Sequence, residues 1–289
     1  MTAGETPAPG WTPSPRELER RAVRTRLARN RVAVATLATV LVLGGLAAAV
    51  LLSPGWSRVQ ESFFDGFHAR ESLPAIVEGF WINVKMFLIA EPLILVVGLA
   101  IALARSSRTP WLVPLRGIAV VYTDVVRGIP TLLLVFLFAF GMPALELQGL
   151  PDGAFFWATV ALVVSYSAYV AEVFRSGIES VHPSQVLSAQ ALALSRPQAM
   201  RYVVVPQATR RVIPPLLNDF VSLQKDTALV ASVSIFDALF TARDYANFNF
   251  NYTPYVVVAC FFVAMTVPLA RLCDWLAARV ARREQAGAL

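Results

Sequence analysis

The chain has 289 residues, of which 56% are hydrophobic and only 15% charged, and its mean hydropathy is +0.59. Soluble domains are about half apolar and about a quarter charged, so this composition excludes an ordinary soluble domain and indicates an integral membrane protein. The net charge of +6 does not indicate a nucleic-acid partner, because the sequence has no basic, aromatic-interleaved soluble segment to bind one.

The N-terminal part is polar, then basic, then apolar. Residues 1–15 are rich in proline, which predicts a disordered tail. Residues 16–31 predict a short surface helix, and residues 32–52 are long enough to cross about 30 Å of hydrocarbon. A cleaved signal peptide is the alternative for this run. A retained span is favoured because the preceding polar region and the apolar run are both long for a signal peptide. The arginines of the predicted surface helix are Arg16, Arg20, Arg21, Arg24, Arg26, Arg29 and Arg31.

Further spans are predicted at 75–104, 129–147, 154–174, 204–223 and 254–278, which gives six in all. The fifth span is the least apparent, because prolines and arginines crowd its entrance. Alternate loops hold most of the arginines, namely Arg105, Arg108, Arg116, Arg127, Arg175, Arg196, Arg201, Arg210, Arg211, Arg279, Arg282 and Arg283. The other loops hold only Arg58, Arg70 and Arg243. By the positive-inside rule, both termini are predicted to be cytoplasmic.

A long polar and basic stretch separates the fourth and fifth spans. Within it, the alanines and leucines of Ser184–Met200 favour a helix, which Pro197 is expected to break near its end. Small residues on this helix would let another surface approach closely. From the residues alone, two interpretations remain open: docking to a soluble partner, and an amphipathic linker that lies on the bilayer.

The stretch resembles the EAA loop of permease subunits of bacterial ATP-binding-cassette importers, in the branch that takes up polar amino acids. The resemblance covers about residues 75–275. It rests on an ordered series of motifs: Tyr122, Arg127-Gly128-Ile129-Pro130-Thr131, Ala168-Tyr169-Val170-Ala171-Glu172, Arg175-Ser176-Gly177-Ile178, Gln185, Pro206-Gln207-Ala208, Arg210, Pro214-Pro215, Asn218 and Lys225-Asp226-Thr227.

The resemblance implies an all-α membrane fold of six transmembrane helices. Five would form the core of a type I importer permease and one N-terminal helix would be extra. Four regions follow: a disordered, basic cytoplasmic tail (1–31), the extra helix with an outside loop (32–74), the permease domain (75–278) and a cytoplasmic C-terminal tail (279–289). The expected location is the bacterial cell membrane.

The same resemblance implies partners. Two ATPase subunits would dock on the loop around 176–203, an extracytoplasmic binding protein would deliver a polar amino acid, and a second permease subunit would complete the pathway within the membrane lipid. The residues expected to couple to the ATPase are Gly177, Ser184, Gln185, Leu187, Ser188, Ala189, Ala191, Leu192, Ala193 and Leu194. The candidates for the translocation path or gate are Glu91, Arg127, Pro130, Glu172, Asn218, Lys225, Asp226 and Thr227.

The coupling helix departs from the family pattern. Leu187-Ser188-Ala189 replaces Glu-Ala-Ala, Ala193 replaces a glycine, and Ser184 replaces another. These departures predict the loss of a polar contact to the ATPase and a less sharp turn after the helix.

Several charged candidates have a second interpretation. Glu91-Pro92 interrupts the 75–104 span, and Pro92 is expected to kink it. Glu91 either lines the path, contacting an amino group, or pairs with an arginine or hydroxyl of a neighbouring helix. Glu172 and Arg175 have the spacing of a local ion pair, with gating as the alternative. Lys225-Asp226 is either a solvated pair or part of the gate.

The sequence contains no glycine-rich phosphate loop, so ATP hydrolysis is assigned to another subunit and the chain is not expected to be an enzyme. Its two histidines, His68 and His182, are isolated, so neither a metal nor a cofactor is expected. Two other functions remain as alternatives. One is a secondary carrier driven by an ion gradient, with Glu91 as its coupling carboxylate. The other is a scaffold whose loop recruits a regulator.

Overall fold

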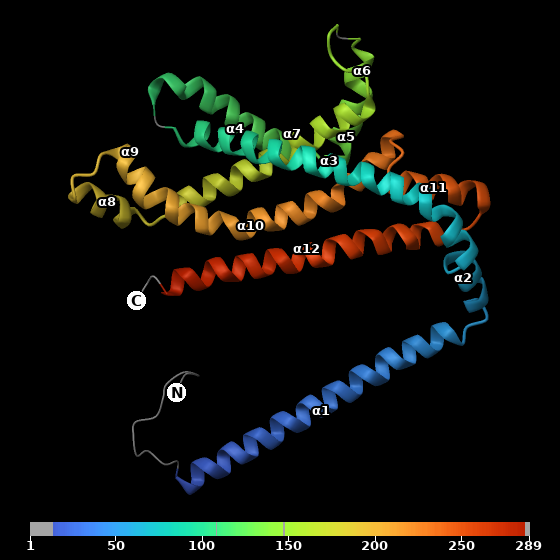
Figure 1. Cartoon of the computed structure of the whole chain (residues 1–289). Coiled ribbons are helices and arrows are strands. Elements are labelled where there is room, and N and C mark those ends of the chain that lie inside the picture. Colours follow the sequence, from blue (N-terminus) through green and yellow to red (C-terminus); the bar gives the residue numbers. More distant parts are fainter. Residues whose placement is uncertain (1–13, 108, 147, 287–289) are drawn as a thin grey trace. The chain divides into compact units, whose positions relative to one another are not determined.

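The computed structural model describes residues 14–107, 109–146 and 148–286, and the regular elements in these ranges are all helical (Figure 1). Residues 1–13 of the predicted tail, and Arg108, lie outside the described residues. The chain divides into two compact units, residues 1–60 and 61–289.

The first unit contains α1 (Pro15–Leu51). The Ser14 hydroxyl accepts a hydrogen bond from the Glu17 amide at 3.3 Å, and Pro15 occupies the first turn, where a missing N–H costs nothing. Described by itself, α1 is one uninterrupted helix of 37 residues (Figure 1). The predicted surface helix (16–31) and the first predicted span (32–52) are therefore a single element.

The short α2 (Trp56–Phe63) joins the two units along the chain. The second unit then follows as α3 (Gly66–Ser106), η1 (Pro110–Leu112), α4 (Val113–Gly128), α5 (Thr131–Phe136), η2 (Leu137–Gly141), α6 (Met142–Ala144), α7 (Ala154–Glu179), α8 (Pro183–Ala191), α9 (Arg196–Ala199), η3 (Met200–Val204), α10 (Val205–Asp226), η4 (Thr227–Val233), α11 (Ala238–Asn249) and α12 (Thr253–Ala286).

Within the second unit, α3, α7, α10 and α12 pack side by side, and α4 lies along α3 and α7 (Figure 1). The helices α8 and α9 lie at one end of this bundle, and α11 lies at the other (Figure 1). The two ends of the bundle are therefore built from different segments of the chain.

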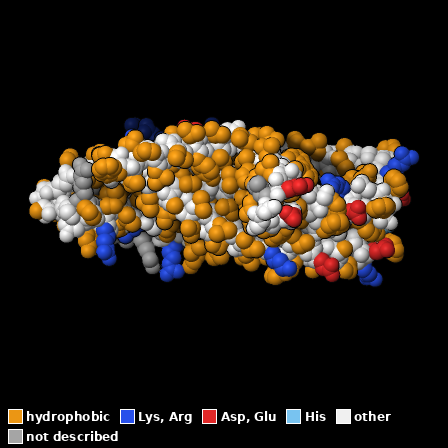
Figure 2. Space-filling model, turned by 90° about the horizontal axis from the view of Figure 1, so that it is seen from above, with side chains coloured by type: hydrophobic (Ala, Val, Ile, Leu, Met, Phe, Trp, Pro, Cys, Tyr) orange, Lys and Arg blue, Asp and Glu red, His pale blue; other side chains and the backbone are white. Residues whose placement is uncertain are grey.

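The core lies mainly between α3, α7 and η4. The helix α7 is buried on most of its circumference: the four consecutive residues 165–168 are all buried, and Ala158, Ala161 and Leu162 pack in the core. Gly98 of α3 allows close packing, because a Cβ atom there would stand 2.6 Å from Val170 Cγ1. Hydrophobic side chains also predominate on the surface seen in Figure 2, as expected for helices in contact with lipid.

Four of the described helical segments are long and apolar enough to cross a bilayer: Pro15–Leu51, Trp56–Ser106, Ala154–Glu179 and Thr253–Val280. The pair Pro110–Gly128 and Thr131–Ala144 makes a fifth if it is counted as one span, bent by 105°. The helix α10 has the length of a span, 22 residues, but a more polar composition.

The predicted span at 129–147 contains α5, η2 and α6, and a further helix precedes it. The arginine-containing segment before this span was expected to be a cytoplasmic loop, but residues 113–128 form α4. The break comes at Ile129, which is extended (φ −98°, ψ 129°) because it precedes Pro130. In α3, by contrast, the helix continues through both Pro74 and Pro92, so Glu91-Pro92 does not interrupt it.

Candidate functional site

The loop around residues 176–203 begins where α7 ends at Glu179, and the short helix α8 follows. His182 caps α8: its Nδ1 accepts a hydrogen bond from the Ser184 amide at 3.2 Å and lies 2.8 Å from the Ser184 hydroxyl. Pro183 is in the first turn. His182 thus has a structural role, and the serine that replaces the family glycine takes part in the cap.

The end of α8 is a left-handed turn at Ala193, with φ +58°. The Ala193 amide donates to the Gln190 carbonyl at 2.9 Å, and the Leu194 amide reaches back to the Ala189 carbonyl at 3.1 Å. This pair of bonds is a Schellman motif, which normally has glycine at the left-handed position. The prediction of a less sharp turn was therefore wrong, because the alanine makes the sharp turn. The prediction that Pro197 ends the helix was also wrong: α8 ends at Ala191, and Pro197 lies in the first turn of α9.

The predicted coupling residues divide into an outer and an inner set. Leu187 and Leu192 are 63% and 77% exposed, whereas Ala189 is buried and Leu194 is half-buried. Gly177 is also buried, and a Cβ atom there would collide with Val212 of α10. The remaining exposed members are Ser184, Gln185, Ser188, Ala191 and Ala193. The outward surface of α8 and of the residue that follows it therefore carries two large apolar side chains that the described residues do not cover.

The inner side of the loop is tied to α10. Arg211 donates a hydrogen bond to the Ser180 carbonyl, and Val181 packs with Val204 and Ala208 in a small buried cluster. The residues just before α8 are thereby joined to the start of α10.

An ionic cluster around Glu172 joins three helices near the same end of the bundle. Arg175 forms the predicted local pair with Glu172. The structure adds Arg105 of α3, whose Nη1 lies 3.0 Å from Glu172 Oε2, and Arg127 of α4 at 3.9 Å. Arg105 also donates to the Thr123 hydroxyl at 2.6 Å. The pair is thus part of a larger network (the Glu172 cluster: Glu172, Arg105, Arg127 and Arg175) that holds α3 and α4 against α7.

Glu91 of α3 and Asp219 of α10 lie close enough for their charges to interact. Asp219 Oδ2 is buried and has no hydrogen-bond partner among the described residues. The ion pairs and hydrogen bonds of the described side chains include no arginine or hydroxyl partner for Glu91. The pairing that the sequence offered as the alternative is therefore not found there.

The remaining path candidates lie in different environments. Asn218 and Lys225 are exposed, whereas Thr227 is buried at the start of η4. Asp226 accepts a hydrogen bond from the Tyr166 hydroxyl at 2.7 Å, which links α10 to α7, so Lys225 and Asp226 are not simply a solvated pair. Pro130 precedes α5 at the bend after α4.

A buried polar group that no sequence motif predicted lies at the opposite end of the bundle. The Asn83 side chain of α3 donates to the Thr227 carbonyl at 3.2 Å and to Asp237 Oδ2 at 2.9 Å, and it accepts from the Ala238 amide at 3.2 Å. Asn83 is 2% exposed and Asp237 is fully buried. This group, the Asn83 clip (Asn83, Thr227, Asp237 and Ala238), fixes both ends of the segment between α10 and α11.

Local features strengthen the clip. Gly79 lies one turn before Asn83, and a Cβ atom there would be 2.6 Å from the Asp237 carbonyl carbon. Asp237 also caps α11 by accepting from the Phe240 amide at 2.8 Å. Burial raises the pKa of Asp237 to about 6, against the opposing effects of its hydrogen bonds and of Arg243. No sequence motif marks the clip, because its members are 144 to 155 residues apart.

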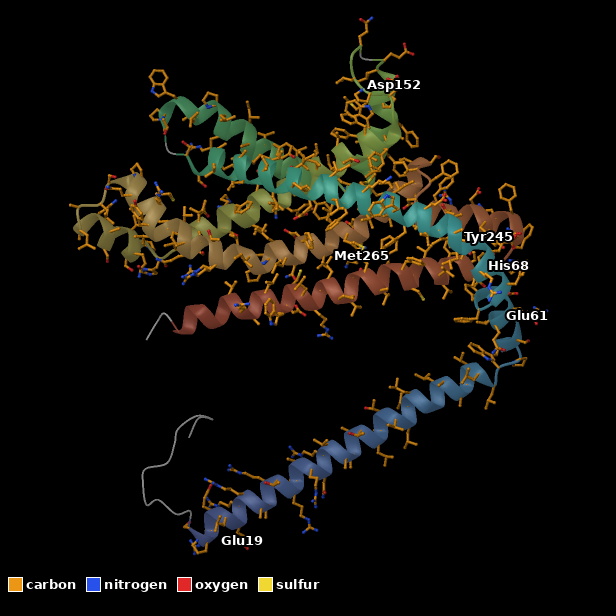
Figure 3. All side chains as sticks on the ribbon, viewed as in Figure 1. Glu19, Glu61, His68, Asp152, Tyr245 and Met265 are labelled. Atoms are coloured by element: carbon orange, nitrogen blue, oxygen red, sulfur yellow. The ribbon has the colours of Figure 1, made fainter. Side chains whose placement is uncertain are left out.

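His68 takes part in a third polar contact, also at the α11 end. Its Nδ1 lies 2.9 Å from the Tyr245 hydroxyl, which donates to Glu71 at 3.0 Å, and the two rings are adjacent in Figure 3. The described residues contain no group of three histidine, cysteine or acidic side chains that could hold a metal ion.

Comparisons with known proteins agree on one family. Residues 94–282 match the family described as binding-protein-dependent transport system inner membrane component. The chain is 33% identical over 207 residues to the probable glutamine ABC transporter permease protein GlnM of Bacillus subtilis, covering 71% of this chain and 92% of the relative. It is 30% identical over 187 residues to the arginine transport system permease protein ArtQ of the same organism, covering 65% and 83%.

Solved structures give the same result. The crystal structure of an amino acid ABC transporter with histidines superposes with a TM-score of 0.68 at 30% identity, covering 74% of this chain and 98% of that one. The MetNI methionine ABC transporter, in an inward-facing conformation, has a TM-score of 0.60 at 16% identity and supports the fold alone.

Proposed function

Because the chain belongs to the family of binding-protein-dependent transport system inner membrane components, we propose that it forms an amino-acid pathway coupled to its ATPase through α8. The chain is the permease subunit of an ATP-driven importer in a bacterial inner membrane, and a separate subunit hydrolyses the ATP. Its partners are of three kinds: an ATPase, a substrate-binding protein and a second permease subunit.

The coupling proposal rests on one observation: Leu187 of α8 and Leu192, directly after it, are exposed at an end of the bundle. Large apolar side chains on a polar loop favour contact with another protein. Two ATPase subunits, one for each permease subunit, would dock here. Arg211 and the buried cluster behind α8 would pass the motion to α10. The missing glutamate of the family motif would leave this contact mainly apolar.

Six spans are proposed, with α10 as the fifth and the bent pair as the third. The polar composition of α10 is compatible with a span that packs against α7 and α12 and lines a pathway. Both termini would be cytoplasmic, which places α8 and the Glu172 cluster on the side of the ATPase. The cluster would then act as a contact that holds α3, α4 and α7 together near the inner gate.

The substrate proposed is a polar amino acid, supported by the names of the relatives. Glu91 and Asp219 would attract its ammonium group, because no cationic side chain among the described residues pairs with Glu91. Glu91→Gln should then raise the KM for uptake several-fold without lowering thermal stability. Glu78→Gln, at an exposed position of the same helix, is the control. Unchanged uptake in Glu91→Gln would remove Glu91 from the path.

The coupling proposal is tested by purifying the tagged chain with its partners from the native membrane. The double variant Leu187→Asp/Leu192→Asp should lose co-purifying ATPase by at least about tenfold, because charges replace the apolar contact. Leu145→Asp/Leu150→Asp adds the same charge to exposed leucines of a different loop and should retain the ATPase. Full recovery with the first variant would contradict the proposal. Uptake by the chain alone under an ion gradient would instead support the secondary carrier.

A further inference from the structure

The N-terminal half of α1 is the most strongly charged segment of the chain, and the family match, which begins at residue 94, does not include it. Residues 16–31 carry seven arginines and two glutamates, a net charge of +5, and all their basic groups are arginines. The apolar half of α1 follows directly, without a break in the helix. The basic segment therefore emerges from the bilayer as the rigid continuation of a span.

The four arginines nearest the apolar half are Arg24, Arg26, Arg29 and Arg31. Successive residues of a helix are rotated by about 100°, so Arg24 and Arg31 point to one side of the helix and Arg26 and Arg29 to the opposite side. Each is exposed, and within the described part of the chain none has a carboxylate partner. A protein partner would cover one face of such a helix, whereas lipid headgroups surround a helix that crosses their layer.

Distance along the axis separates these arginines from the others. At about 1.5 Å per residue, Arg24 to Arg31 lie within about 12 Å of Val32, the first apolar residue. Arg16 and Arg20 lie about 18–24 Å from it on the same scale. Surface potentials decay over a Debye length of about 8 Å at physiological salt. The near group can thus reach the headgroup layer, and the far group cannot.

From this placement we propose that Arg24, Arg26, Arg29 and Arg31 bind the phosphate groups of anionic phospholipids on opposite sides of α1, where it leaves the bilayer. Guanidinium groups suit this ligand because their planar fork donates two parallel hydrogen bonds to a phosphate. In juxtamembrane clusters of this size, each basic residue near an anionic membrane surface strengthens binding to that surface by about fivefold. Lipid binding by these arginines does not depend on transport, so it can be tested independently of the proposed import function.

The test uses the full-length protein with a fluorophore at Val32→Cys, in a background of Cys260→Ser and Cys273→Ala. It is placed in phosphatidylcholine vesicles that contain a small, equal fraction of either nitroxide-bearing phosphatidylglycerol or nitroxide-bearing phosphatidylcholine. The ratio of the two quenching efficiencies measures the local enrichment of anionic lipid. We expect a ratio of at least about three that falls towards one at high salt, because salt screens the attraction.

Two variants of equal charge make the test position-specific. Arg29→Gln/Arg31→Gln should lower the ratio by at least half, whereas Arg16→Gln/Arg20→Gln should leave it nearly unchanged. A ratio of one in the unsubstituted chain would overturn the proposal, and so would equal losses in the two variants. Displacement by inorganic phosphate beyond that caused by chloride at matched ionic strength would assign the site to a free anion and also overturn it.

Discussion

The two ends of the helical bundle are held in opposite ways. At the α11 end, the buried Asn83 side chain joins three groups of a distant segment, so that breaking it would leave buried polar atoms without partners. At the α8 end, the chain turns through backbone bonds at Ala193 and presents exposed leucines. We expect the segment that the Asn83 clip holds to keep one arrangement. We expect α8 to be able to move with a partner while breaking few internal contacts.

Removing the Asn83 clip is expected to have the largest effect on the stability of the chain. Asn83→Ala leaves the Thr227 carbonyl, the Asp237 carboxyl and the Ala238 amide without the hydrogen bonds that Asn83 makes to them. Each buried group that loses its partner destabilises the fold by about 1–3 kcal/mol. We expect the free energy of unfolding to fall by about 4 kcal/mol. The measurement is denaturation in detergent, followed by the reaction of a maleimide dye with buried Cys273 in a Cys260→Ser background.

Leu88→Ala is the control for that variant, because Leu88 lies on the same helix and is exposed. Its effect should stay below about 1 kcal/mol. Equal losses in the two variants would show that the clip is no more important than an ordinary surface contact, and the contrast between the two ends would then disappear.

The pH dependence of stability sharpens the same comparison, with a somewhat smaller effect. The pKa of Asp237 is about 6 in the folded chain and 3.8 in a reference aspartate, so the folded state binds the proton more tightly. Its contribution to stability is therefore fully present below about pH 4 and is lost as the pH rises through about 6. The loss should amount to roughly 3 kcal/mol at most.

Asp237→Asn isolates this contribution from those of the other titrating groups. The asparagine cannot accept from both Asn83 and Phe240, so the variant is less stable, but it has no charge at this position. The stability advantage of the unsubstituted chain over the variant should shrink between pH 4 and pH 6. A constant or growing advantage would show that the buried carboxyl is not the titrating group.

Sequence reasoning succeeded where the information is local. The motif series led to the family, and the alanine-rich composition led to the helix at α8, because short-range propensity and motif order carry both. It failed where distant groups decide the structure. Neither Asn83 nor Asp237 belongs to a local pattern, and only the packing of α3 against the segment before α11 brings them together.

Two other outcomes have the same physical basis. The i,i+3 spacing of Glu172 and Arg175 predicted their pair, but Arg105 and Arg127 come from other helices and gave no signal. Arginines made residues 105–128 resemble a loop, although most of the segment is helical, since a charge at one end of α4 is compatible with an apolar face along its length.

The smallest expected effect concerns the α8 end. Ala193 pays a steric penalty of about 1 kcal/mol for its left-handed conformation, which glycine avoids. Ala193→Gly should therefore stabilise the turn and slow hydrogen exchange of the Leu194 amide by about fivefold, while leaving global unfolding unchanged. Ala191→Gly lies two residues earlier, in the last turn of α8, where glycine lowers helix stability, so it should speed the same exchange. Opposite signs for the same substitution at these two positions would show that the turn after α8 is held by its backbone conformation. Equal signs would mean that side-chain contacts hold the turn, as they hold the other end of the bundle.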